Sequence, residues 1–308
     1  MCRLFGMTAG TLPVHATFWL LDAPDSLEAQ SRRNADGSGI GFFDRSGQPV
    51  LDKQPEPAFG DREFIREAKH AESATFVAHV RLATAGGPSL ANTHPFTMHG
   101  RIMAHNGGLG EISRLDAELG PYRDLVLGDT DSERYFALIT QQIDMHDGDV
   151  GAGIVAAARW IGTHLPVSSL NAVVTAPGEL WALRYPGQHA LHVISRPAGD
   201  SKPAGVRDPG GDRQPGGDDQ PAAGPHGAPP AGLHVRSAMS SVRAPGLRDI
   251  PTVVVASEEL DGESGWRMLA AGELLHVRPD LTIESAVVLP DPPARLIPLT
   301  GHGPNIDT

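Results

Sequence analysis

The chain contains one cysteine, and this cysteine is residue 2. Once Met1 is removed, Cys2 carries a thiol and a free α-amino group on the same residue. The amine titrates near pH 7.7–8.0 and a thiol at about pH 8.5, so the amine can accept the thiol proton directly or through one water. Such a residue combines a nucleophile with its own base. The alternative interpretation is a small apolar residue at the start of a buried strand.

Two hydrogen-bond donors stand next to each other in the sequence AHNGGL, where Asn106 precedes Gly107. A side-chain N–H and a backbone N–H that converge on one oxygen stabilise an oxyanion. Asn-Gly is also the strongest two-residue signal for a hairpin turn. Taken alone, these residues favour the turn.

One arginine interrupts an otherwise apolar segment, Arg81 in AHVRLAT. A guanidinium in such a place needs a partner, and its planar fork matches a carboxylate. A substrate α-carboxylate and an internal Asp or Glu are both open interpretations. Thr84 and His94 follow in the same stretch and could add hydrogen bonds to the bound group.

An acidic residue stands at the start of an expected helix, Asp131 in GDTDSERYF. Its ordinary role is that of an N-cap, together with Ser132 as the other candidate cap. The alternative is a charge-assisted contact with a substrate ammonium group.

Two other sequence patterns were considered as a dinucleotide-binding site and as a metal site. The glycines of NADGSGIGFFD, residues 34–44, suit a close backbone approach, although the residue types favour a turn that leads into a strand. No helix follows as a dinucleotide-binding fingerprint requires. The side chains of His79, His94, His105 and Asp129 match no known metal-ligand spacing. We therefore expect no cofactor and no metal.

Strands and helices are both expected. Short runs of apolar or β-branched residues predict strands. The predicted strand segments are CRLFGMTAG, GIGFFD, ATFVAHVRLAT, GRIMAHNGGLG, SLNAVVTAPGELWALRYPG, ALHVISR, LHVRSAMSS, TVVVASEEL and GELLHVRPDLTIESAVV. The segment GRIMAHNGGLG is predicted to lead into a turn. Helical spacing marks DREFIREAKHA, TDSERYFALITQQIDMH and GAGIVAAARWIGTHL. This order predicts a layered α+β fold.

Composition narrows the class of protein. The net charge of -12 and pI near 5.5 argue against a nucleic-acid-binding protein, and no Lys/Arg run is present. A single cysteine excludes an intramolecular disulfide and suits a reducing compartment. We find no signal peptide and no apolar run long enough to cross a bilayer. The expectation is a cytoplasmic protein without membrane contact.

A change in composition interrupts the chain at residues 197–233, which are rich in Pro, Gly and Asp. Such a segment cannot bury enough apolar surface to offset the entropy of ordering it, so we predict disorder. Strand-like sequence on both sides favours an insertion in one domain spanning residues 1–290, and the alternative is a linker between two domains. Residues 291–308 are predicted to be a flexible tail.

The order of these features resembles the class II glutamine amidotransferases. An N-terminal Cys is followed by Arg-x-Ala-Thr, Asn-x-His-Pro, His-Asn-Gly and Thr-Asp-Ser-Glu. NADGSGIGFFD and VVVASEELDGESGW are most similar to small stand-alone members, which include the ergothioneine-pathway γ-glutamyl amidohydrolase. The resemblance implies an N-terminal-nucleophile hydrolase fold with four αββα layers, in which two mostly antiparallel sheets stack between helices.

The resemblance also implies roles for individual residues. Cys2 matches the nucleophile, and Asn106 with Gly107 matches the oxyanion hole. The substrate-binding positions are matched by Arg81, Thr84, His94 and Asp131. The sequence departs from the family at residues 82 and 85, where Leu and Ala replace the Trp and His of Arg-Trp-Ala-Thr-His-Gly.

The expected reaction is attack of Cys2 on the γ-amide of glutamine or a γ-glutamyl compound, followed by hydrolysis of the thioester to glutamate. Two alternatives are an acylase with an N-terminal cysteine that acts on non-glutamyl amides, and an inactive amidotransferase-like binding subunit. A stand-alone hydrolase, a homo-oligomer and a subunit associated with a synthase are all compatible with the sequence.

Overall fold

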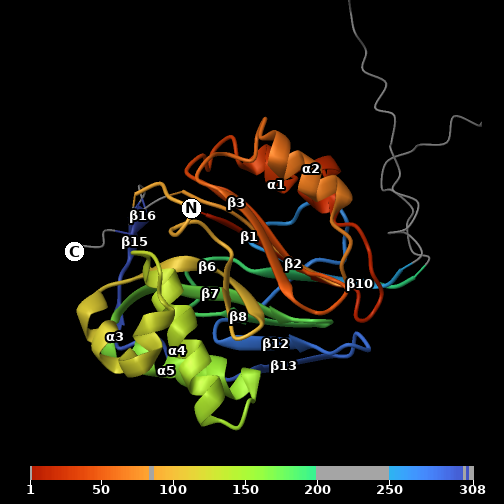
Figure 1. Ribbon diagram of the computed structural model, residues 1–308. Helices are drawn as coiled ribbons and strands as arrows, with labels where there is room; N and C mark the ends of the chain where they lie inside the picture. Colours follow the sequence, from red (N-terminus) through yellow and green to blue (C-terminus); the bar gives the residue numbers. More distant parts are fainter. Residues whose placement is uncertain (1, 83–86, 199–249, 301–302, 305–308) are drawn as a thin grey trace, which may run out of the picture. The chain divides into compact units, whose positions relative to one another are not determined.

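The computed structural model describes residues 2–82, 87–198, 250–300 and 303–304. In this part of the chain two β-sheets lie face to face, and helices cover the outer face of each (Figure 1). The predicted α+β class with four αββα layers is confirmed.

The first sheet has the order β11-β9-β10-β1-β4-β2-β3, and its paired neighbours are antiparallel. In chain order its strands are β1 (Arg3–Thr8), β2 (Ser38–Phe43), β3 (Pro49–Gln54), β4 (Thr75–Val80), β9 (His192–Arg196), β10 (Thr252–Ala256) and β11 (Arg267–Met268). The strand that follows Cys2 is therefore central, between β10 and β4.

The second sheet has the order β13-β12-β8-β7-β6-β5, and β14 pairs with β7 in parallel. Its strands are β5 (Phe96–Met98), β6 (Arg101–Leu109), β7 (Pro166–Ala176), β8 (Glu179–Arg184), β12 (Glu273–Val277), β13 (Ile283–Val287) and β14 (Arg295–Leu296). A separate short pair is formed by β15 (Leu299–Thr300) and β16 (Gly303–Pro304).

The helices divide between the two sheets (Figure 1). On the first sheet lie a π-helical turn (Phe18–Asp22), α1 (Leu27–Gln30) and α2 (Arg62–His70). On the second lie α3 (Ile112–Leu119), a 3₁₀ turn (Gly120–Leu125), α4 (Asp131–Met145) and α5 (Val150–His164).

Alternation along the strands builds three apolar layers, because successive side chains point to opposite faces of a sheet. In β1, Phe5 and Met7 pack toward α1 and α2, whereas Leu4 packs between the sheets. In β6, Ala104 packs between the sheets and Met103 packs against the helices of the second sheet. The same alternation directs residue 105 toward α4 and residue 106 toward the first sheet.

Most predicted elements are present. The sequence patterns did not predict β3, β5 and α3, nor the short elements α1, β11, β14, β15 and β16 and the π-helical and 3₁₀ turns. The strand before Arg81 ends at Val80, so Arg81 lies just beyond it. The glycine-rich segment leads into strand β2, as the favoured interpretation of a turn before a strand predicted, and Gly39 also allows a close approach, since a Cβ there would lie 2.3 Å from the His94 carbonyl oxygen.

The predicted insertion lies outside the described residues from residue 199 onward, as does the predicted strand LHVRSAMSS. On its two sides, β9 and β10 are neighbouring antiparallel strands of the first sheet. Its disorder and the 1–290 domain remain predictions. No helix in the described segments is long and apolar enough to span a membrane.

Candidate functional site

Cys2 lies directly before β1 and contacts the chain just beyond the neighbouring strand β4. The thiol donates to the Leu82 carbonyl oxygen, and the Leu82 N–H donates to Sγ, both at 3.3 Å. Burial raises the pKa of the Cys2 thiol, and the Asp131 carboxylate acts in the same direction. The Leu82 hydrogen bond and the Arg81 charge act in the opposite direction. A thiol in this environment needs a base to form the thiolate.

Asn106 meets Cys2 from the second sheet. Its side-chain Nδ2 donates to the Cys2 carbonyl oxygen at 2.9 Å. The favoured turn interpretation of Asn106-Gly107 is wrong, because β6 continues through both residues and pairs them with Asn171 and Leu170 of β7. Glycine is needed at residue 107 for close packing: a Cβ there would lie 1.9 Å from the Ser169 carbonyl oxygen.

Asp131 is the first residue of α4, and the cap prediction was wrong by one or two residues. Thr130 is the N-cap, and its hydroxyl accepts from the Glu133 N–H at 3.2 Å. Asp131 Oδ2 instead accepts from the Leu109 N–H at 2.8 Å, which holds the carboxylate against the end of β6. Its charge raises the pKa of the Cys2 thiol, so the two groups share one electrostatic environment.

Ser132 contacts the Asp131 carboxylate directly, and His105 contacts Ser132 in turn. The Ser132 N–H donates to Asp131 Oδ1 at 2.8 Å, and the Ser132 hydroxyl lies 2.9 Å from His105 Nδ1. The other ring nitrogen of His105 lies 3.1 Å from the Ser169 carbonyl oxygen, so it carries the proton and donates. Neither residue was selected as part of the site from sequence.

Arg81 is buried, with 4% of its surface exposed. Its backbone N–H donates to the Gly37 carbonyl oxygen at 2.7 Å, and its own carbonyl accepts from Asp36 at 3.0 Å. These bonds fix the chain as it leaves β4, and the guanidinium charge lowers the pKa of the Cys2 thiol. Thr84 lies outside the described residues.

His94 is buried and stacks on His79, with ring centroids 4.2 Å apart. Lys53 holds the chain on both sides of it by donating to the carbonyl oxygens of Thr93, at 2.8 Å, and Pro95, at 3.3 Å. Burial and the neighbouring histidines and cations lower the pKa of His94 well below its ordinary value. The ring is therefore neutral near pH 7, and its proposed role in substrate binding remains a prediction.

Comparison with known families identifies the chain. A family model described as glutamine amidotransferases class-II matches residues 1–199. The chain belongs to the class II glutamine amidotransferases.

Sequence similarity to curated proteins supports this family assignment. The γ-glutamyl-hercynylcysteine sulfoxide hydrolase of Mycobacterium tuberculosis is 38% identical over 117 residues, which are 35% of this chain and 49% of that protein. The chain spans about half the length of the curated relatives that it matches.

Solved structures support the fold. The glutamine aminotransferase class-II domain protein from Silicibacter pomeroyi has a TM-score of 0.54 at 18% identity, covering 92% of this chain and 98% of that one. The glutamine phosphoribosylpyrophosphate amidotransferase from B. subtilis has a TM-score of 0.59 at 16% identity, covering 94% of this chain and 50% of that one. The N-terminal-nucleophile hydrolase fold is thus confirmed for this chain.

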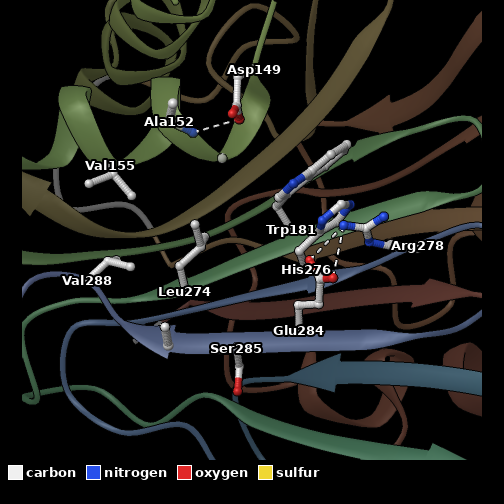
Figure 2. Close-up of a pocket in the computed structure, with 12 residues that line it drawn as sticks. Asp149, Ala152, Val155, Trp181, Leu274, His276, Arg278, Glu284, Ser285 and Val288 are labelled. Atoms are coloured by element: carbon white, nitrogen blue, oxygen red, sulfur yellow. Dashed lines mark hydrogen bonds and ion pairs between the residues drawn. The ribbon is translucent and has the colours of Figure 1, made fainter.

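A cavity of about 530 Å³ lies away from these residues, between α5 and strands β12 and β13 (Figure 2). Trp181 and His276 stack in it with ring centroids 4.6 Å apart, and Arg278 pairs with Glu284 at 2.9 Å. None of the predicted site residues lines this cavity. Across the described ranges, no group of His, Cys, Asp or Glu could hold a metal ion.

The buried residue His79 should make the stability of the folded chain sensitive to acid. Burial, with the charges of His105 and Arg81, lowers the pKa of His79 to about 3. An unfolded histidine titrates near pH 6.5, so between about pH 6.5 and 3 the unfolded chain binds a proton that the native chain does not. The free energy of unfolding therefore falls with decreasing pH, by about 1.4 kcal/mol per pH unit for one proton.

His79→Phe keeps an aromatic ring beside His94 and removes this proton. We expect the slope of unfolding free energy against pH between pH 6 and 4 to decrease by about 1.4 kcal/mol per unit. Chemical denaturation at several pH values measures the slope. An unchanged slope would show that His79 is protonated in the native protein.

Proposed function

We propose that this chain is an amidohydrolase that attacks the γ-amide of glutamine or of a γ-glutamyl compound with the Cys2 thiolate. The observation that carries the proposal is the position of Asn106, whose Nδ2 lies 2.9 Å from the Cys2 carbonyl oxygen. A hydrogen-bond donor from the second sheet is thereby placed beside the nucleophilic residue, and the Asp131 charge acts at the same point.

The proposed reaction begins after removal of Met1. The free Cys2 amine accepts the thiol proton, and Sγ attacks the γ-carbonyl carbon of the substrate. The Asn106 side-chain N–H and the Gly107 backbone N–H stabilise the tetrahedral oxyanion. The protonated Cys2 amine gives its proton to the leaving amine as the C–N bond breaks. Water then attacks the γ-glutamyl thioester, which releases glutamate and restores the thiol.

The proposed substrate is held at both ends of its amino-acid group. The Arg81 guanidinium binds the α-carboxylate with two parallel hydrogen bonds, and Thr84 and His94 add contacts to the same end. Asp131 binds the α-ammonium group. Non-glutamyl acyl groups lack these charges, and this difference argues against the acylase alternative.

The name of the M. tuberculosis relative supports γ-glutamyl amides as the substrate class. If ammonia leaves, the reaction is glutaminase chemistry; if a larger amine leaves, it is γ-glutamyl hydrolysis. We place the enzyme in the cytoplasm, where a reducing environment preserves a free thiol. Association with a synthase subunit or with a second copy of the chain is compatible with this reaction.

A release assay tests the proposal directly. The full chain is incubated with L-glutamine and a panel of γ-glutamyl amides, and free glutamate is measured with the intact mass of the protein. We expect glutamate from at least one of these amides and a mass that lacks Met1. Full activity in protein that retains Met1 would refute the mechanism, and no glutamate from any amide would refute the function.

Arg81→Lys tests the binding of the α-carboxylate. Lysine keeps the positive charge but loses the fork that contacts both carboxylate oxygens. We expect kcat/KM for glutamyl substrates to fall roughly 10- to 150-fold, as for the loss of one charge-assisted hydrogen bond. Steady-state kinetics of the folded variant measures this decrease.

The control for Arg81→Lys removes the carboxylate from the substrate. 4-Aminobutanamide, which is glutamine without its α-carboxylate, should be a poor substrate of the wild type and should be hydrolysed almost equally by Arg81→Lys. Equal impairment of both substrates would instead assign Arg81 a structural role.

A further inference from the structure

The strand that carries Cys2 is held by residues that lie far beyond the region matched by the family model. Strand β10 ends at Ala256, opposite Phe5, and Ser257 follows directly. The Ser257 N–H donates to the Leu4 carbonyl oxygen, and its hydroxyl accepts from the Leu4 N–H, both at 3.0 Å. One backbone and one side-chain hydrogen bond thus hold Leu4 beyond the end of the strand pairing, two residues from Cys2.

The same hydroxyl contacts Asn106. Nδ2 of Asn106 lies 3.5 Å from Ser257 Oγ and 2.9 Å from the Cys2 carbonyl oxygen. Because a carbonyl oxygen only accepts, the atom beside it must be the amide nitrogen. Its two N–H groups therefore face Cys2 and Ser257. In the proposed reaction the N–H beside Cys2 is the one that turns to the oxyanion, while the contact with Ser257 keeps the amide plane oriented. Asn106 and Ser257 are both buried.

We infer that Ser257 is a positioning residue for the proposed reaction: its hydroxyl holds the Asn106 amide in the orientation that an oxyanion donor needs beside Cys2. This inference rests on the proposed function. A donor contributes most to catalysis when it is fixed before charge develops in the transition state. Loss of the hydroxyl leaves Asn106 with one contact in place of two.

Ser257→Ala removes the hydroxyl and leaves the backbone bonds of the strand in place. The backbone bond from Ser257 to Leu4 does not need the side chain, and Leu4 also remains paired with His79 of β4. The contacts of the Ser257 hydroxyl with Leu4 and Asn106 are the ones that the substitution removes. The effect should therefore appear in kcat, with KM for the glutamyl substrate unchanged.

The experiment compares Ser257→Ala with Ser73→Ala in the full chain, using L-glutamine or the γ-glutamyl amide that the wild type hydrolyses best. Ser73 is a matched control, since it is equally buried (5% exposed) and its hydroxyl also accepts from backbone N–H groups, those of Phe43 and Thr75. We expect kcat to fall about tenfold in Ser257→Ala, as for the loss of one hydrogen bond. Ser73→Ala should keep the wild-type kcat.

A double-mutant cycle tests whether Ser257→Ala lowers kcat through Asn106. In an Asn106→Ala background, Ser257→Ala should lower kcat less than about threefold, because its partner is already absent. Ser257→Thr restores a hydroxyl and should recover most of the activity. Circular dichroism corrects each kcat for the folded fraction.

A third measurement does not depend on turnover. In protein labelled with ¹⁵N-asparagine, the side-chain amide signals of Asn106 are assigned by their loss in Asn106→Ala. We expect Ser257→Ala to shift these signals and Ser73→Ala to leave them in place. Unshifted signals, a wild-type kcat in Ser257→Ala, or equal effects in both backgrounds would overturn the inference. If the wild type were inactive but Ser257→Ala still shifted the Asn106 signals, the proposed function would be refuted, whereas the contact between Ser257 and Asn106 would be supported.

Discussion

Cys2→Ala should abolish glutamyl hydrolysis and leave the fold intact. We expect kcat to decrease by at least roughly 10⁴-fold, because no other group can form the thioester. The thermal midpoint should change little, since Cys2 is only half-buried and its thiol contacts one backbone segment at 3.3 Å. Glutamate release and circular dichroism measure the two outcomes.

Two controls separate chemistry from processing. Alanine and serine at residue 2 are both small enough to allow removal of Met1, so the variants keep a free amine at the same place. Cys2→Ser should retain only slight activity, because a hydroxyl is a poorer nucleophile near neutral pH. A diazo-ketone analogue of glutamine should label only Cys2, the single cysteine of the chain. Normal turnover by Cys2→Ala would remove Cys2 from the mechanism.

The strands and long helices were predictable because their signals are local. Alternating or continuous apolar residues identify β1, β4, β6 and β7 without knowledge of their neighbours. For the start of α4, a more specific local signal was available than the presence of Asp131 and Ser132. Thr130 stands three residues before Glu133, which is the spacing of a capping box, and this spacing predicts Thr130 as the N-cap.

The Asn106-Gly107 pair could not be interpreted from local sequence. Asn-Gly favours a turn when glycine supplies a positive φ. Here the glycine is required by Ser169 on β7, whose carbonyl oxygen leaves no room for a Cβ. A distinction between turn and close approach depends on a strand about sixty residues away, which no pattern in AHNGGL reveals.

The contacts that hold the chain beside Cys2 were missed for a similar reason. Ser257 is 253 residues from Leu4, and Glu258 pairs with Arg3 at 2.6 Å across a similar separation. The sequence ASEEL resembles the end of a strand, and its polar residues carry no sign of their partners. Only the pairing of β10 with β1 places them beside Cys2.

Asn106→Ala is the second substitution with a large expected effect. Loss of one oxyanion donor typically decreases kcat by roughly 10²–10³-fold, because charge on the tetrahedral oxygen is no longer stabilised. KM should change little, since the proposed contacts with the α-carboxylate and ammonium groups come from Arg81 and Asp131. Steady-state and single-turnover kinetics of the folded variant measure the decrease in the chemical step.

Asn171→Ala provides the matched control for Asn106→Ala. Asn171 lies directly opposite Asn106 in the β6–β7 pair and is fully buried. Its amide donates to the carbonyl oxygens of His189 and Ala190, and its Oδ1 accepts from the Tyr185 N–H. These bonds tie β7 to the chain around β8, so Asn171→Ala should lower the thermal midpoint and leave kcat within about twofold per folded molecule. A similar loss of kcat in both variants would mean that distortion of the second sheet, and not a missing donor beside Cys2, accounts for the effect of Asn106→Ala.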